Sequence, residues 1–201
     1  MKPICYLATL GLMASAPPAL AGTCPTRDDL DRSGIHFDVA DGAYEVFRTH
    51  TDGILSSLYF EGEDAAPLRV LLAQGIYLLE TADMDTRTGT PDPASRVTYA
   101  FPMAAPKMPL PTPGGAFSVS AAVMENGDIR REDQTYTFGP ETQIIFGPCT
   151  YKAIEIKITY PGEDSSDTLT YLPDLGLAYL SSATYDGNTE TYTYLAVRKA
   201  D

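Results

Sequence analysis

Residues 154–160 read IEIKITY, a stretch in which apolar and polar side chains alternate. Successive side chains of a β-strand point to opposite faces of the sheet. The alternation therefore predicts a strand with one buried face and one face in water, as in an antiparallel sheet that covers a core on one side.

Asp-Gly and Asn-Gly pairs extend this prediction along the chain. Such pairs tolerate the positive φ angles of tight turns, so a pair between two strand-like runs predicts a hairpin. Four pairs occupy such positions: Asp41-Gly42, Asp52-Gly53, Asn126-Gly127 and Asp186-Gly187. We expect about nine to eleven strands joined by short turns. The predicted fold is all-β, a curved antiparallel meander sheet or a partly closed barrel that hides its edges.

Two stretches are harder to interpret. Residues 68–74 follow Pro67 and have the composition of a short helix, whereas the apolar run 76–79 favours a strand. We predict one long strand over 67–81 with a bulge or bend at Gly75. Residues 24–32 have room for one helical turn.

The N-terminus has the three parts of a secretion signal. Lys2 supplies a positive charge, residues 4–13 are mostly apolar, and residues 19–21 read Ala-Leu-Ala, a small-x-small cleavage site. We predict that residues 1–21 are a cleavable signal and that residues 22–201 form a single β domain. Thr23, immediately before Cys24, does not fit a lipobox, so we expect no acyl group. No later stretch has the ~20 apolar residues of a membrane span, and the mature chain is expected to be soluble and periplasmic.

Two cysteines, Cys24 and Cys149, remain once the signal carrying Cys5 is removed. An even pair in an exported chain predicts a disulfide. A loop of this length gains roughly 5 kcal/mol on the chain-entropy account. The alternative, a redox or metal site, needs a close cysteine pair or neighbouring histidines, and the sequence has neither.

The net charge of −13 bears on possible partners. An acidic surface repels nucleic acid and anionic lipid headgroups, so nucleic-acid binding is excluded as a function class. An acidic surface also suits a cationic ligand, although solubility alone explains the charge.

A proline-rich loop interrupts the strand pattern. Residues 101–115 read FPMAAPKMPLPTPGG, and the five prolines remove backbone donors and favour polyproline conformations. We interpret the segment as an excursion within one domain. Our hypothesis is that it lies over one opening of the curved sheet, where Phe101, Met103, Met108 and Leu110 contact a ligand or partner. The alternative is a disordered surface loop.

No motif for catalysis, a metal or a cofactor is present. The chain has two histidines, His36 and His50, and lacks GxSxG, HExxH, GxGxxG and P-loop sequences. Residues 83–87 (DMDTR) contain part of a calcium-loop pattern without its central glycine and closing glutamate. Glu163, Asp164 and Asp167 form a second acidic turn. We therefore predict no catalytic residue, no metal and no cofactor, and leave open a pair of acids that the fold brings together.

The C-terminal part resembles a known group of proteins. Residues 149–151 (CTY), an alternating strand and residues 171–177 (YLPDLGL) are similar to uncharacterised exported β-rich proteins of Gram-negative bacteria. A looser resemblance is to periplasmic lipoprotein-carrier folds, which implies a curved sheet that holds acyl chains on its concave face. The helical lid expected of such carriers is missing, unless the proline-rich loop replaces it.

Three functions are compatible with the sequence. The first is a non-catalytic periplasmic protein that binds an apolar or amphipathic ligand, or a protein partner, in the cell envelope. The second is a hydrolase that uses carboxylates or a histidine. The third is a structural envelope protein. An apolar cavity would favour the binding protein. Two acids or a His-acid pair in one cleft would favour the hydrolase, and a filled core would favour the structural protein.

Overall fold

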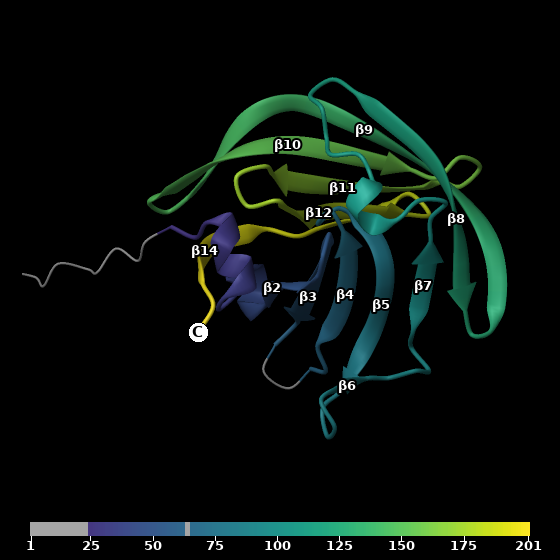
Figure 1. Cartoon of the computed structure of the whole chain (residues 1–201), viewed down its shortest axis with the longest axis horizontal. Helices are drawn as coiled ribbons and strands as arrows, with labels where there is room; N and C mark the ends of the chain where they lie inside the picture. Colours follow the sequence, from purple (N-terminus) through teal and green to yellow (C-terminus); the bar gives the residue numbers. More distant parts are fainter. Residues whose placement is uncertain (1–23, 63–64) are drawn as a thin grey trace, which may run out of the picture.

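The fold is one antiparallel sheet, bent so that β9 to β12 arch across β3 to β7 (Figure 1). The computed structural model describes residues 24–62 and 65–201, so the predicted signal, residues 1–21, lies outside the described part. Within these described residues, fourteen strands belong to the sheet, which is not closed. The described residues also form 3₁₀ helices at Arg27–Asp31 (η1), Ala40–Gly42 (η2) and Ala105–Lys107 (η3). The prediction of an all-β, curved antiparallel sheet is confirmed.

The first seven strands precede the proline-rich loop. They are β1 (Ile35–Val39), β2 (Tyr44–Thr51), β3 (Ile54–Phe60), β4 (Leu68–Ala73), β5 (Tyr77–Asp85), β6 (Thr90–Pro91) and β7 (Val97–Ala100). The other seven follow the loop. They are β8 (Ala116–Glu125), β9 (Asp128–Phe146), β10 (Cys149–Thr159), β11 (Ser165–Leu172), β12 (Leu177–Tyr185), β13 (Asn188–Thr191) and β14 (Tyr194–Lys199). The strands outnumber our prediction because β6, β7 and β13 are too short to show alternation and because β4 and β5 were predicted as one strand.

The sheet is a meander with one long-range pairing. Its order is β13-β12-β11-β10-β9-β8-β7-β5-β4-β3-β2-β1-β14, with β6 paired to β5 beside this path. Strands that follow each other in the chain are therefore neighbours almost everywhere, as the short turns predict. The exception is β14, which returns to β1 and places Ile35 opposite Lys199.

Residues 188–199 contribute both edges of the sheet. β13 pairs with β12 at one edge, and β14 pairs with β1 at the other. The two residues between them bond to both sides. The Tyr192 N–H donates to the Ser181 carbonyl (2.9 Å), and the Thr193 carbonyl accepts from the Ala40 N–H (2.8 Å). Residues 188–199 thus form two strands, broken where the chain passes from one edge to the other.

The prediction of one long strand over 67–81 is wrong. β4 and β5 are antiparallel partners, and the turn between them contains Gln74 and Gly75 with φ angles of 51° and 69°. The turn is tightly packed, because the Gly75 carbonyl accepts a 2.8 Å hydrogen bond from the Ala178 N–H on β12. A Cβ atom on Gly75 would lie 2.5 Å from the Gly176 carbonyl oxygen. Gly75 therefore permits both the turn and its close contact with the other half of the sheet.

The core lies between the two halves of the sheet and has two clusters. In the first, Phe37 packs against Phe146 and Tyr194, each with ring centroids 5.7 Å apart. In the second, Tyr77 packs edge-on against Tyr136, with centroids 4.8 Å apart. In both clusters, aromatic rings from one half of the sheet meet rings from the other.

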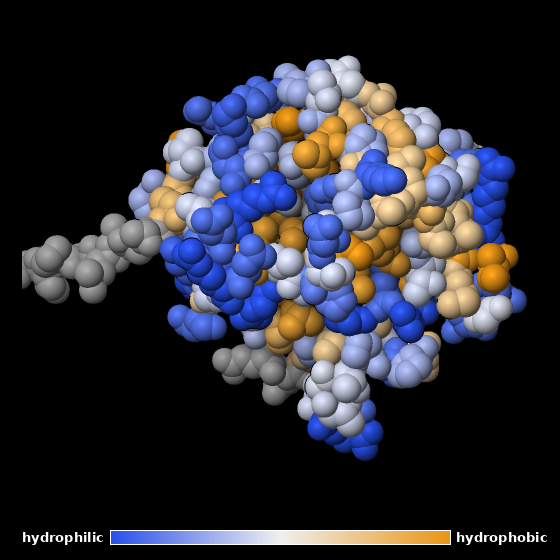
Figure 2. Space-filling view, viewed as in Figure 1, coloured by the Kyte–Doolittle hydropathy of each residue, from blue (hydrophilic) through white to orange (hydrophobic). Residues whose placement is uncertain are grey.

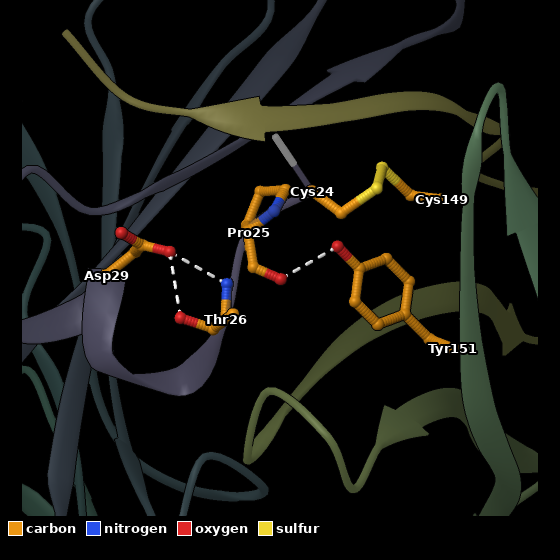
Figure 3. Close-up of a disulfide and its surroundings, with 6 residues drawn as sticks. All are labelled: Cys24, Pro25, Thr26, Asp29, Cys149 and Tyr151. Carbon is orange, nitrogen blue, oxygen red and sulfur yellow. Dashed lines mark hydrogen bonds between the residues drawn. A yellow bond between two sulfur atoms is a disulfide. The ribbon is translucent and has the colours of Figure 1, made fainter. Parts of the chain in front are cut away.

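A disulfide ties the N-terminal end of the described chain to β10 (Figure 3). Cys24 and Cys149 have Cα atoms 5.5 Å apart, so the predicted pairing is confirmed. The Tyr151 hydroxyl donates a 2.9 Å hydrogen bond to the Pro25 carbonyl beside the disulfide. Helix η1 follows directly and supplies the helical turn expected in this stretch. Among the described residues, no helix is long and apolar enough to cross a membrane.

Candidate functional site

A cavity of about 240 Å³ lies between the two halves of the sheet, and we call it the interior cavity. One wall comes from β2, β4, β5 and β7, and the other from β9 to β12. Figure 2 shows hydrophobic residues between hydrophilic ones in the middle of the molecule, where these two groups of strands meet. Most of the lining is apolar: Leu68, Val70, Leu72, Ile76, Leu78, Ile158, Leu169, Ala178 and Leu180.

Strand alternation creates the apolar wall. Leu68, Val70 and Leu72 alternate along β4 and face the cavity, where they stay half-buried. On the opposite wall, Leu169 of β11 lies next to Leu180 of β12. The space equals that of roughly eight water molecules at about 30 Å³ each. A concave, mostly apolar site with a few polar groups is typical of small-molecule binding.

Glu45 is the first polar group of the interior cavity. Its neighbours across β1 and β3 are Phe37 and Tyr59. The Glu45 carboxyl accepts hydrogen bonds from Ser57 at Oε1 and from the Tyr194 hydroxyl at Oε2, the latter 2.5 Å long. Burial raises the pKa of Glu45 to about 7, and the two hydrogen bonds only partly offset this effect. Near neutral pH the carboxyl is therefore present in both protonation states.

Asp167 is the second polar group of the interior cavity. It lies on β11 opposite Ile158, and its Oδ2 accepts a 2.5 Å hydrogen bond from the Tyr160 hydroxyl. This is the one side-chain hydrogen bond that Asp167 makes among the described residues. Burial raises the pKa of Asp167, and the nearby negative charge of Glu132 adds to the effect. The sequence placed Asp167 in an acidic turn with Glu163, whereas the structure turns it into the interior cavity.

A chain of hydrogen bonds follows one face of β9 from the cavity toward solvent. The Tyr136 hydroxyl donates to Gln134 Oε1 (2.7 Å), and Gln134 Nε2 donates to Glu132 Oε1 (2.7 Å). Arg130 completes the chain by donating to Glu132 Oε2 (2.6 Å). Gln134 and Tyr136 line the interior cavity, while Arg130 is half-exposed. Tyr136, Gln134 and Arg130 therefore each donate a hydrogen bond to a neighbouring side chain on β9.

The proline-rich loop packs on the core beside the cavity. Met108 is buried in the second cluster, and Phe101 and Met103 pack against the same cluster. The Tyr77 hydroxyl donates a 2.6 Å hydrogen bond to the carbonyl of residue 109 within the loop. Leu110, in contrast, is 52% exposed. The structure brings three of the four predicted lid residues together, but none of the four lines the interior cavity.

The histidines lie away from the interior cavity. His36 stacks on Tyr44 with ring centroids 5.1 Å apart, and its Nε2 is 2.9 Å from Asp38 Oδ1. This His-acid pair lines a surface pocket whose described residues include no serine, threonine or cysteine that could act as a nucleophile. His50 is exposed near the end of β2.

The acidic stretches stay separate. The Asp85 carboxylate accepts hydrogen bonds from the backbone N–H and the guanidinium of Arg87. The backbone N–H of Asp83 donates to the Ser95 hydroxyl. Within residues 24–62 and 65–201, no group of three or more histidine, cysteine, aspartate or glutamate side chains is placed to hold a metal ion.

Sequence reasoning missed most of the polar cavity residues. Glu45 carries a usable signal, because it is two residues from Phe47 and shares its face of the strand. Gln134 and Tyr136 carry a weaker sequence signal. Positions 133 and 135 are polar too, so the sequence does not show which face of this strand points inward.

Comparison with protein families, with curated proteins and with solved structures finds no match to this chain.

Proposed function

We propose that the protein is a non-catalytic binding protein of the cell envelope and that it holds a small apolar or amphipathic ligand in the interior cavity. The observation that carries this proposal is the half-buried apolar wall of β4, which lines a mostly apolar cavity between the two halves of the sheet. A core filled throughout would favour a purely structural role, and the cavity argues against that alternative. The disulfide and the signal-like N-terminus support an exported, periplasmic protein.

Occupation of the cavity can be tested with a substitution that fills it. Val70→Phe adds volume to the cavity wall, whereas Leu71→Phe makes the same kind of change at the next position of β4, which does not line the cavity. We expect Val70→Phe to reduce binding of a hydrophobic fluorescent dye and Leu71→Phe to leave it near the wild-type level. Equal dye binding by all three proteins would contradict a ligand site in this cavity.

Native mass spectrometry of the protein purified from the periplasm is the complementary measurement. A retained small molecule that is lost in Val70→Phe and kept in Leu71→Phe would identify the ligand directly. Recovery of the protein in the cytoplasm, with residues 1–21 retained, would contradict the proposed location.

A carboxylate-dependent hydrolase is the second candidate. It is favoured by two acids, Glu45 and Asp167, that line one cavity and both have a raised pKa. A carboxyl group with a raised pKa can act as a general acid near neutral pH. A screen of chromogenic esters and glycosides tests this candidate, since turnover must disappear in both Glu45→Gln and Asp167→Asn.

A further inference from the structure

We propose that the polar end of the ligand is an ammonium group, so that the interior cavity takes an amphiphilic amine rather than a fatty acid or an alcohol. This inference rests on the proposed function and adds the charge of the ligand to it. Its basis is a carboxylate oxygen that remains open on the cavity wall, together with the distribution of charge around the cavity.

Several hydrogen-bond donors in and around the polar wall are already used within the protein. Tyr160 donates to Asp167, and Tyr194 and Ser57 donate to Glu45. Farther along β9, the hydroxyl of one tyrosine and the amide of one glutamine are used in the same way. Among the acceptors, Oδ1 of Asp167 and the lone pairs of the hydroxyl oxygens remain open toward the cavity.

Asp167 is the acceptor best placed for a ligand. Its Oδ2 is occupied by Tyr160, but its Oδ1 receives no hydrogen bond from the described residues and is not enclosed by protein atoms. A carboxylate oxygen that is open to a mostly apolar cavity gains most from a charged donor. Both oxygens of Glu45, in contrast, already accept a hydrogen bond. We therefore assign Asp167 as the contact for the ammonium group.

The charge around the cavity favours the same sign of ligand. No described lysine, arginine or histidine lines the cavity, whereas two carboxyl groups do. Arg130, the cation close to this region, is bonded to Glu132 and its charge is compensated there. A bound carboxylate would meet two acids and no base in a poorly solvated space, which is costly. An ammonium group would instead form an ion pair.

Aromatic rings add to the preference. Tyr99, Tyr136, Tyr160 and Tyr179 all line the cavity. The face of a tyrosine ring attracts a cation within about 6 Å of the ring centroid. The apolar wall of β4 would then hold the alkyl part of the ligand, and the volume of about 240 Å³ suits a short chain.

Three ligands that differ only at the head group test the inference on the wild-type protein. Octylamine, octanol and octanoate are titrated calorimetrically at pH 8, where the amine is protonated. We expect octylamine to bind at least about tenfold tighter than octanol, and octanoate to show no binding. Equal or tighter binding of octanol or octanoate would overturn the inference while leaving the proposed function intact. Failure of all three to bind would overturn both.

A pair of variants tests the assigned contact. Asp167→Asn keeps an acceptor for Tyr160 but removes the charge, and it should weaken octylamine about tenfold while leaving octanol unchanged. Asp164→Asn removes the same charge from the exposed turn nearby and should leave both affinities unchanged. An unchanged octylamine affinity in Asp167→Asn, or an equal loss in Asp164→Asn, would overturn the assignment. Circular dichroism verifies that both variants fold. The titrations of the wild-type protein test the inference even if a variant fails to fold.

Discussion

Replacing Glu45 by glutamine should stabilise the protein at pH 8, because the wild-type carboxyl has to lose its proton inside the fold. Burial raises the pKa of Glu45 from its ordinary value of 4.5 to about 7. At 1.36 kcal/mol for each tenfold change, this difference corresponds to about 3 kcal/mol. Glutamine has the same shape and no charge, and the hydroxyls of Ser57 and Tyr194 can rotate to donate to its oxygen and accept from its nitrogen.

The sign of the pH dependence follows from proton binding. Below pH 4.5 the carboxyl is protonated in both the folded and the unfolded chain, so it contributes no difference. Between pH 4.5 and about 7 the folded state holds the proton that the unfolded state has lost. Stability therefore falls as the pH rises through this window, and above it the full cost of about 3 kcal/mol remains.

Urea denaturation of wild type and Glu45→Gln at about pH 4 and pH 8 measures the effect. The variant-minus-wild-type difference in the free energy of unfolding isolates Glu45, because groups such as Asp167 and His36 titrate in both proteins. We expect this difference to grow by up to about 3 kcal/mol between the two pH values. Glu155→Gln, an exposed glutamate on β10, should show no such growth. A pH-independent difference for Glu45→Gln would refute the reasoning.

Four further outcomes are expected. Replacing Cys24 and Cys149 together by alanine should cost about 2–5 kcal/mol in urea denaturation and leave the β signal in circular dichroism unchanged; a changed spectrum would contradict a purely stabilising disulfide. Gly75→Ala combines a φ of 69° with a 2.5 Å contact and should cost at least ~2 kcal/mol, whereas Gly187→Ala, which has a φ of 74° and open space, should cost only about 1 kcal/mol. Tyr77→Phe removes the bond to the proline-rich loop, so limited proteolysis there should accelerate and stability should fall by ~1 kcal/mol. A chelator should leave the melting temperature unchanged, and a fall reversed by calcium would reveal a metal site.

The fold could be predicted where side chains separate cleanly by polarity. Residues 154–160 alternate, and Asn126-Gly127 forms a hairpin turn with φ angles of 52° and 86°. The β4–β5 hairpin was missed because residues 70–72 are consecutive apolar side chains, so the alternation is lost there, and because its turn carries Gln74-Gly75 instead of an Asp-Gly or Asn-Gly pair.

The interior cavity was harder to predict for the opposite reason. Its polar residues break the rule that polar side chains face water, and Asp167 looks like part of an exposed acidic turn. Only its pairing with Ile158 places it on the concave face. The proline-rich loop shows a similar limit, since composition predicted its apolar contacts but not that Met108 would reach the core while Leu110 stays exposed.

The return of β14 to β1 has a consequence for how this protein can be made. Asp38 and Arg198, which meet across the two strands, are 160 residues apart in the chain. A ribosome or a translocation channel delivers β1 first, so its outer backbone groups wait unpaired while nearly all later strands emerge. Such an edge can recruit other chains, and distant pairings form slowly. Because residues 188–199 supply both edge strands, their arrival covers the outer backbone groups of β1 and of β12 together. The interval before that arrival is when a holding chaperone would be most useful to the nascent chain.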